Sequence, residues 1–68
     1  MTSKIESLNQ AKGLRVGQVL FQDESERFFI KIIDAEYVIL GSESDESHLK
    51  ILTLHSLARD EWYSVESG

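Results

Sequence analysis

Residues 27–40, with the sequence RFFIKIIDAEYVIL, decide the fold of this 68-residue chain. β-Branched and aromatic side chains fill residues 27–33, and residues 36–40 repeat that composition after Asp34 and Ala35. Two such runs separated by a short turn are typical of a β-hairpin. We therefore predict two antiparallel strands, over residues 27–33 and 36–40, joined by a tight turn at Asp34 and Ala35.

The predicted hairpin carries apolar side chains on both of its faces. Phe28, Ile30 and Ile32 point to one side of the first strand, because side chains alternate along a strand. Phe29 and Ile33 point to the other side. A hairpin with one face in water would alternate apolar and polar side chains. Something must therefore cover the second face, and three covers stay open: the curled sheet itself, an N-terminal helix or a second chain.

Glycines and two acidic, polar clusters divide the rest of the chain into further short elements. The clusters at residues 23–26 and 42–47 have the composition of loops. Ser56 is a suitable cap for one helical turn over residues 57–60. Three more strands are predicted, at residues 16–22, 48–54 and 62–65.

The N-terminal residues 1–13 carry the signature of a short helix. Ser3 and Glu6 have the spacing of a capping box, in which each side chain bonds the backbone of the other residue. Gly13 suits the left-handed position that follows many helix ends. We predict a helix over residues 4–12, and the alternative interpretation is a frayed leader without regular structure.

The stretch LRVGQV at residues 14–19 is similar to the segment that enters the first strand of many SH3-like barrels. The stretch TLHSL at residues 53–57, followed by Trp62, is similar to the helical turn that these barrels place before their last strand. Residues 14–65 therefore resemble an SH3-like fold. The resemblance implies a mostly β domain over residues 14–68, built as a small five-stranded antiparallel barrel, with the short helix preceding it.

The same resemblance carries an expectation about function. SH3-like barrels commonly act as binding modules for peptides, protein surfaces or nucleic acid, without catalysing a reaction. Members that bind proline-rich peptides use clustered exposed aromatic rings, and this chain offers only Tyr37, Trp62 and Tyr63 for that role. We therefore expect a non-enzymatic protein-interaction module, or a small accessory or inhibitory protein, rather than a receptor for proline-rich peptides.

The charge of the chain bears on the kind of partner. Seven Lys and Arg residues against twelve Asp and Glu residues give a formal net charge of −5. An acidic surface repels the phosphate backbone and favours basic partners, so we expect a protein partner before a nucleic acid. No apolar run is long enough to cross a membrane, and residues 1–10 lack the apolar core of a signal peptide. We therefore expect a cytoplasmic location.

Nothing in the sequence indicates catalysis, a cofactor or a metal. His48 and His55 would lie about 23 Å apart along an extended strand, at about 3.3 Å per residue, and so cannot bind one metal ion. Ser56 is better explained as a helix cap than as a nucleophile, and the four glycines are too scattered for a phosphate loop. The chain also has no cysteine, so packing or self-association as a homodimer must stabilise so short a domain.

Two groups of residues are candidates for partner binding. Phe29, Tyr37 and Val38 are expected to form an apolar patch on the hairpin, and Arg27 and Lys31 share the face of Phe29. Cations around an aromatic ring are typical of platforms for single-stranded nucleic acid, which is the alternative function. The second group is an acidic surface in the 42–47 loop, made by Glu43, Asp45 and Glu46.

The expected core consists of large apolar side chains from the predicted strands and the helical turn. Its members are Phe21, Phe28, Ile30, Ile32, Ile39, Ile51, Leu57 and Trp62. Burial of this set would leave the apolar patch and the acidic loop as the surfaces available to a partner.

Overall fold

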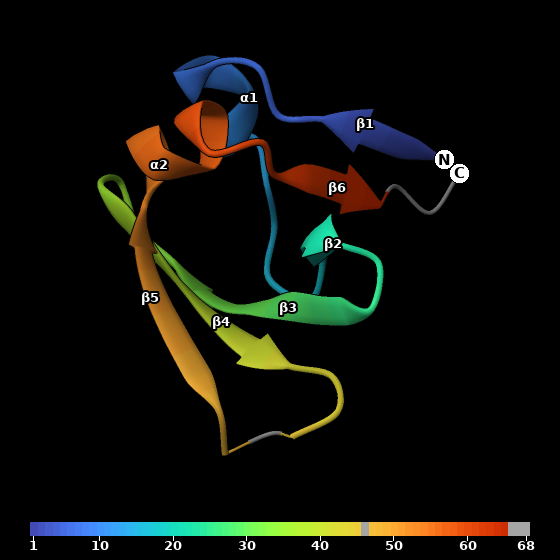
Figure 1. The fold of residues 1–68 in the computed structure, drawn as a ribbon. Helices are drawn as coiled ribbons and strands as arrows, with labels where there is room; N and C mark the ends of the chain where they lie inside the picture. The colour runs from blue at the N-terminus through green and yellow to red at the C-terminus, as the bar shows by residue number, and fades with distance from the viewer. Residues whose placement is uncertain (46, 66–68) are drawn as a thin grey trace.

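The computed structural model describes residues 1–45 and 47–65 of the chain. In these residues six strands form one antiparallel sheet, and two short helices pack together at one end of it (Figure 1). The strands are β1 (Thr2–Lys4), β2 (Val19–Asp23), β3 (Glu26–Ile33), β4 (Tyr37–Ser42), β5 (Leu49–Thr53) and β6 (Tyr63–Val65). The helices are α1 (Leu8–Lys12) and α2 (Leu54–Arg59). A mostly β, antiparallel fold is therefore confirmed.

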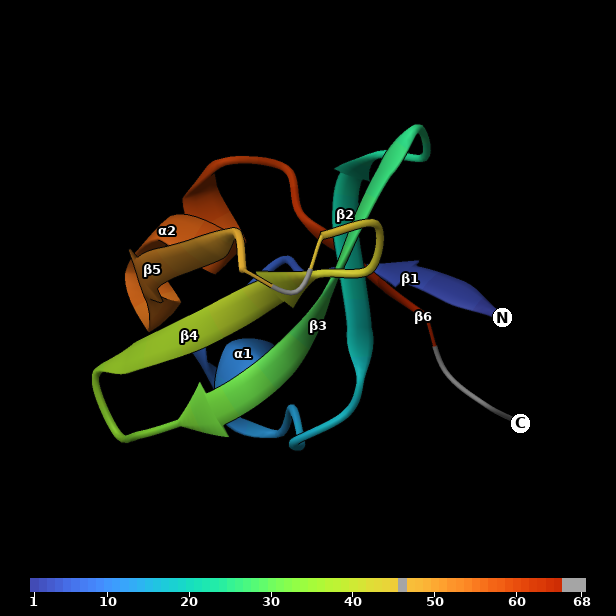
Figure 2. The same cartoon turned by 90° about the horizontal axis from the view of Figure 1, so that it is seen from below.

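The sheet is open, with the strands in the order β1, β6, β2, β3, β4, β5. The described residues thus do not form the predicted closed barrel of five strands. The sheet curls strongly, because the eight residues of β3 cross from the half that holds β2 and β6 to the half that holds β4 and β5 (Figure 2). We call the concave side, which encloses the core, the inner face, and the opposite side the outer face.

The N-terminus adds a strand that the sequence does not predict. β1 pairs with β6, with Ser3 opposite Ser64. Ile5 follows β1 into the core with an exposed fraction of 2%, and its N–H donates a hydrogen bond to the carbonyl of Trp62 at 2.9 Å. These contacts hold residues 2–4 in an extended conformation, so the predicted helix over residues 4–12 starts too early.

Helix α1 begins at Leu8 because Ser7, rather than Ser3, is its N-cap. Ser7 Oγ accepts a hydrogen bond from Gln10 N–H at 3.2 Å. Gln10 Oε1 in turn accepts one from Glu6 N–H at 2.6 Å. The Ser-x-x-Gln sequence therefore forms a variant of the capping box about one turn later than the Ser-x-x-Glu sequence that suggested it.

Helix α2, by contrast, begins at Leu54, three residues before the predicted helical turn. Thr53 is the N-cap, since its Oγ1 accepts a hydrogen bond from Ser56 N–H at 3.2 Å. Ser56, the predicted cap, lies inside the helix and donates its hydroxyl proton to the carbonyl of Thr53 at 2.8 Å. The earlier start brings both Leu54 and Leu57 into the core.

A bulge in β3 decides which side chains face the core. Ile30 pairs with Leu40, but the next pair joins Ile32 to Ile39, so Lys31 is an extra residue in β3. The alternation of side chains therefore shifts by one position after Ile30. Ile30 points to the inner face and is fully buried, whereas Ile32 points to the outer face and is 53% exposed.

The core lies on the inner face, beneath the two helices. Its buried apolar members are Ile5, Ala11, Leu14, Leu20, Phe28, Ile30, Val38, Leu40, Leu54, Leu57 and Trp62. Four of the eight predicted core residues are among them, and Phe21 is buried outside this cluster. The prediction is wrong for Ile32 and Ile51, which are exposed, and for Ile39, which is half-buried on the outer face.

Ile30 and Ile32 form a matched pair that tests the bulge. Ile30→Ala should lower the free energy of unfolding by about 2–5 kcal/mol, because it leaves a cavity in the core. Ile32→Ala should lower it by about 1 kcal/mol or less, because half of the side chain is exposed and it loses only its contact with Ile39 across the strands. Urea denaturation followed by the fluorescence of Trp62 measures both values. Similar costs at the two positions would show that β3 alternates without a bulge.

Candidate functional site

The outer face of β3, β4 and β5 carries a group of large apolar side chains. We call this group the outer patch, and its members are Phe29, Ile32, Tyr37, Ile39, Leu49 and Ile51. The exposed fraction is 41% for Tyr37, 53% for Ile32 and for Leu49, and 69% for Ile51. Contiguous apolar surface of this kind is typical of a contact surface for another molecule.

The strand register makes the outer patch continuous. Ile32 lies opposite Ile39, and Ile39 lies opposite Ile51. Side chains directly opposite each other in an antiparallel pair have Cβ atoms about 4.5–5.5 Å apart, close enough to touch. The three isoleucines therefore form a ridge across three strands, and a second row runs beside it from Phe29 to Leu49.

Gly41 gives Phe29 its place in the outer patch. Gly41 lies opposite Phe29 in the β3–β4 ladder. A Cβ atom at position 41 would lie 3.0 Å from both Phe29 Cζ and Lys31 Cδ. The Phe29 ring therefore covers the bare backbone of β4, and Lys31 Nζ lies 6.0 Å from the centre of that ring.

Carboxylates border the outer patch at both ends of its strands. Asp34 and Glu36 lie in the turn between β3 and β4, and Glu43 and Asp45 lie in the segment between β4 and β5. All four residues are exposed. The second border is tied to β3, because Glu43 N–H donates a hydrogen bond to the carbonyl of Arg27 at 3.0 Å. The outer patch is thus an apolar surface between two acidic borders.

Hydrogen bonds within the loops lower the pKa of two of the acidic side chains. Asp45 Oδ1 accepts hydrogen bonds from the hydroxyl of Ser47 at 2.6 Å and from its N–H at 3.0 Å. These two bonds lower the pKa of Asp45, and the nearby charge of His48 lowers it further. Likewise, Ser25 lowers the pKa of Asp23, first through its N–H, which donates to Asp23 Oδ1 at 3.0 Å, and then through its hydroxyl.

Four of the predicted binding residues share the outer face. Arg27 lies over the ring of Phe21, at 5.6 Å from its centre, and Phe29 and Lys31 cover Gly41. Tyr37 lies further along the sheet at the start of β4. The structure therefore places all four on one face, as the strand periodicity indicates, but brings only Lys31 into contact with Phe29.

The other predicted binding residues are placed differently. Val38 is fully buried and pairs with Leu52, so its predicted place in a surface patch is wrong. It lies on the inner face because it is two residues from Leu40, which pairs with the buried Ile30. Glu43 and Asp45 are exposed between β4 and β5. Glu46 lies outside the described residues.

The sequence analysis placed Ile51 in the core, and this was wrong because the neighbouring lysine faces inward. A lysine ordinarily marks the solvent side of a strand, which would place Ile51, its neighbour, in the core. Lys50 instead points to the inner face, where its Nζ lies 5.2 Å from the centre of the Phe28 ring and 5.7 Å from that of Trp62. Cation–π contact with two rings holds the lysine there, and Ile51 consequently faces outward.

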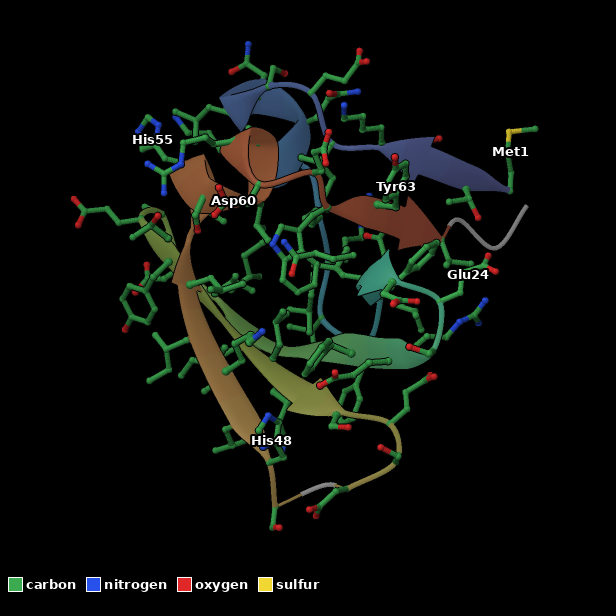
Figure 3. The ribbon with its side chains drawn as sticks, in the orientation of Figure 1. Met1, Glu24, His48, His55, Asp60 and Tyr63 are labelled. Atoms are coloured by element: carbon green, nitrogen blue, oxygen red, sulfur yellow. The ribbon has the colours of Figure 1, made fainter. Side chains whose placement is uncertain are left out.

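Other parts of the chain offer less for chemistry. His48 and His55 lie at opposite ends of β5 (Figure 3). Residues 1–45 and 47–65 contain no group of three or more His, Cys, Asp or Glu side chains that could hold a metal ion, and in the same residues every buried polar side-chain atom has a hydrogen-bond partner. A shallow groove of mixed charge beside α1 is lined by Leu8, Lys12, Ala35, Glu36, Thr53, Leu54 and His55.

Comparisons with protein-family models, with curated proteins and with solved structures found no match to this chain. Neither helix in the described part of the chain is long and apolar enough to span a membrane. The outer patch is the surface that departs most from an ordinary solvated face, and it is therefore the candidate binding site.

The Asp45–Ser47 pair gives a prediction for the acidic border. Ser47→Ala removes the hydroxyl bond and keeps the backbone bond, so the pKa of Asp45 should rise toward its ordinary value without reaching it. In the wild type the pair contributes stability above the ordinary carboxyl pKa and loses it as the pH falls through the lowered pKa. Carboxyl ¹³C shifts measured against pH report both states. Asp23 is the internal control, and a pKa of Asp45 unchanged by the substitution would contradict the assignment.

Proposed function

We propose that this chain is a non-enzymatic protein-interaction module, of the kind found in small accessory or inhibitory proteins, which binds its partner through the outer patch. The observation that carries the proposal is the exposure of Ile32, Leu49 and Ile51, each more than half exposed on one sheet face. Removing apolar surface from water contributes about 25 cal/mol per Å². A partner that covers this face would therefore bind favourably.

The acidic borders indicate the chemistry of the partner. Asp34 and Glu36 at one end, and Glu43 and Asp45 at the other, favour Lys or Arg side chains at matching positions. The formal net charge of −5 acts in the same direction at long range. We therefore expect a partner with an apolar centre and basic flanks, whose association rate depends on the charges more than its final affinity does.

The resemblance of residues 14–65 to SH3-like barrels supports the same class of function. Those domains commonly bind other proteins without catalysis, and residues 14–65 include every strand that carries the outer patch. A fold permits many ligands, however, so the weight of the proposal lies on the patch and its borders.

Single-stranded nucleic acid is the alternative ligand, favoured by the shared face of Arg27, Phe29 and Lys31. Cations beside aromatic rings suit phosphates and stacked bases. Two of the rings on this face are already occupied, since Arg27 lies over Phe21 and Lys31 over Phe29. The most exposed members of the outer patch are aliphatic and offer no stacking surface. We therefore rank a protein partner first.

A photoreactive side chain on the outer patch tests the proposal. Benzoyl-phenylalanine in place of Tyr37 changes one aromatic side chain for another at a position that is 41% exposed. In extracts of the producing cell it should crosslink to a discrete protein, because the partner covers the patch. Adding Ile32→Glu to the same chain should abolish the product, since a charge then stands in the isoleucine ridge.

The control places the same probe at Asn9, an exposed residue of α1. No crosslink of the same mass is expected there. A product of equal yield from both positions would contradict docking on the outer patch. A product that nuclease removes would move the proposal to the nucleic-acid alternative.

The acidic border has a separate prediction. Changing Glu43 to Ser together with Asp45 to Asn should slow association with the crosslinked partner several-fold at low salt, because two steering charges are lost. The difference from the wild type should vanish near 1 M salt, where the Debye length falls to about 3 Å. Stopped-flow association rates give the comparison. Wild-type rates at low salt in the double variant would eliminate a role for this border.

A further inference from the structure

The free edge of β5 is a second surface, distinct from the outer patch that it borders. β5 is the last strand of the sheet, and within the described residues it pairs only with β4. The half of β5 that follows the β4–β5 connection runs away from both helices (Figure 1). Leu49 and Ile51 in this half are 53% and 69% exposed. An open edge of this kind is a template for pairing with another strand.

The register shows which backbone groups point out of this edge. Ser42 N–H donates to the carbonyl of His48 at 3.1 Å, and Leu54 N–H donates to the carbonyl of Glu36 at 3.0 Å. These two bonds fix the pattern of the ladder, in which His48, Lys50, Leu52 and Leu54 direct their backbone groups to β4 and its flanking residues. In an antiparallel ladder the residues between them direct their N–H and C=O groups to the opposite side. The outward-bonding residues are Leu49, Ile51 and Thr53.

The edge lacks proline, one of the features that hinder strand pairing, but it carries another, an inward-pointing charge. The chain contains no proline. The single charged residue of β5, Lys50, points to the inner face, over Phe28 and Trp62. An inward charge protects an edge only when pairing would bring it against a like charge or bury it alone. Lys50 therefore restricts the register of pairing and leaves the edge itself open.

We propose that a second copy of this chain pairs with this edge, so that two β5 strands form an antiparallel ladder around a two-fold axis at Ile51. Outward-bonding residues must face each other, and the registers that then pair at least three residues of each β5 are centred on Lys50, Ile51 or Leu52. The first places two ammonium groups opposite each other, and the third places Lys50 opposite Leu54, which has already entered α2. The register centred on Ile51 uses all five residues of β5 and places Lys50 opposite an uncharged Leu52.

This pairing would extend the sheet and its outer face. The isoleucine ridge of one copy, from Ile32 through Ile39 to Ile51, would meet the ridge of the other copy at the axis. Self-pairing rests on the backbone of the edge and not on the proposed docking of a partner protein, so each proposal can fail alone.

The size of the contact sets the expected strength. Five residues span about 17 Å, and a sheet is about 10 Å thick, so the strip of contact has a cross-section of about 170 Å². A stable interface buries about 800 Å² per partner, and each copy carries a net charge of −5. We therefore expect a reversible dimer that grows with concentration, and that salt strengthens by screening the repulsion.

Sedimentation equilibrium from about 10 μM to about 1 mM protein tests self-pairing. The wild-type mass should rise from 7.8 kDa toward twice that value, and more so at high salt, whereas docking of a basic partner weakens with salt. Ile51→Pro removes an N–H that points away from β4, so the fold should persist, checked by circular dichroism, while the mass stays at 7.8 kDa. Ile32→Glu, two strands from the edge, should retain the dimer.

Amide hydrogen exchange on the wild type gives the same answer without a variant. The amides of Leu49 and Ile51 should become more protected as the concentration rises, whereas those of Lys50 and Leu52, already bonded to β4, should not change. A wild-type mass of 7.8 kDa at 1 mM with no such protection would overturn the proposal. A dimer that Ile51→Pro retains and Ile32→Glu destroys would also overturn it, because the copies would then pack face to face.

Discussion

One extra residue in β3 controls both surfaces of the sheet. Because Lys31 has no partner in β4, the pairs on its two sides, Ile30 with Leu40 and Ile32 with Ile39, lie on opposite faces. Without the bulge, Ile32 would continue the inner row after Ile30, since side chains alternate along a regular strand. The bulge therefore takes Ile32 out of the core and places it opposite Ile39 in the exposed ridge.

The composition of residues 27–40 was sufficient to predict the hairpin, because β-branched and aromatic runs around a short turn have few alternatives. Arg27, Phe29 and Lys31 were correctly placed on one face, since strand periodicity holds up to the bulge. Nothing local marks Lys31 as the extra residue. It becomes the extra residue only in the pairing of β3 with β4, and the error at Ile32 follows from it. The predicted start of the first helix was wrong for a related reason. Pairing of β1 with β6 holds residues 2–4 extended and overrides the helical signal at Ser3.

The outer face is covered over one half of the sheet and exposed to solvent over the other half. Over β2 and β6 the chain covers its own apolar residues: the ring of Phe21 stacks on Tyr63 with centroids 5.6 Å apart, Arg27 lies across it, and Phe21 is only 5% exposed. Over β3, β4 and β5, among the described residues, the only apolar side chain covered in this way is Phe29, over which the stem of Lys31 lies. Curvature alone thus does not account for exposure, because one half of the same face is sealed and the other is not.

The three possible covers of the two-sided hairpin can now be compared. The curl of the sheet closes around the inner face, where it buries Phe28, Ile30 and Val38. The N-terminal segment also serves the inner face, since Ile5 and Ala11 lie in the same core cluster. In the described part of the chain, the curled sheet and the N-terminal segment therefore both cover the inner face of the hairpin. Isoleucine side chains left in water on the other side lose stabilising burial of about 25 cal/mol per Å², and a separate polypeptide is the cover that would recover it.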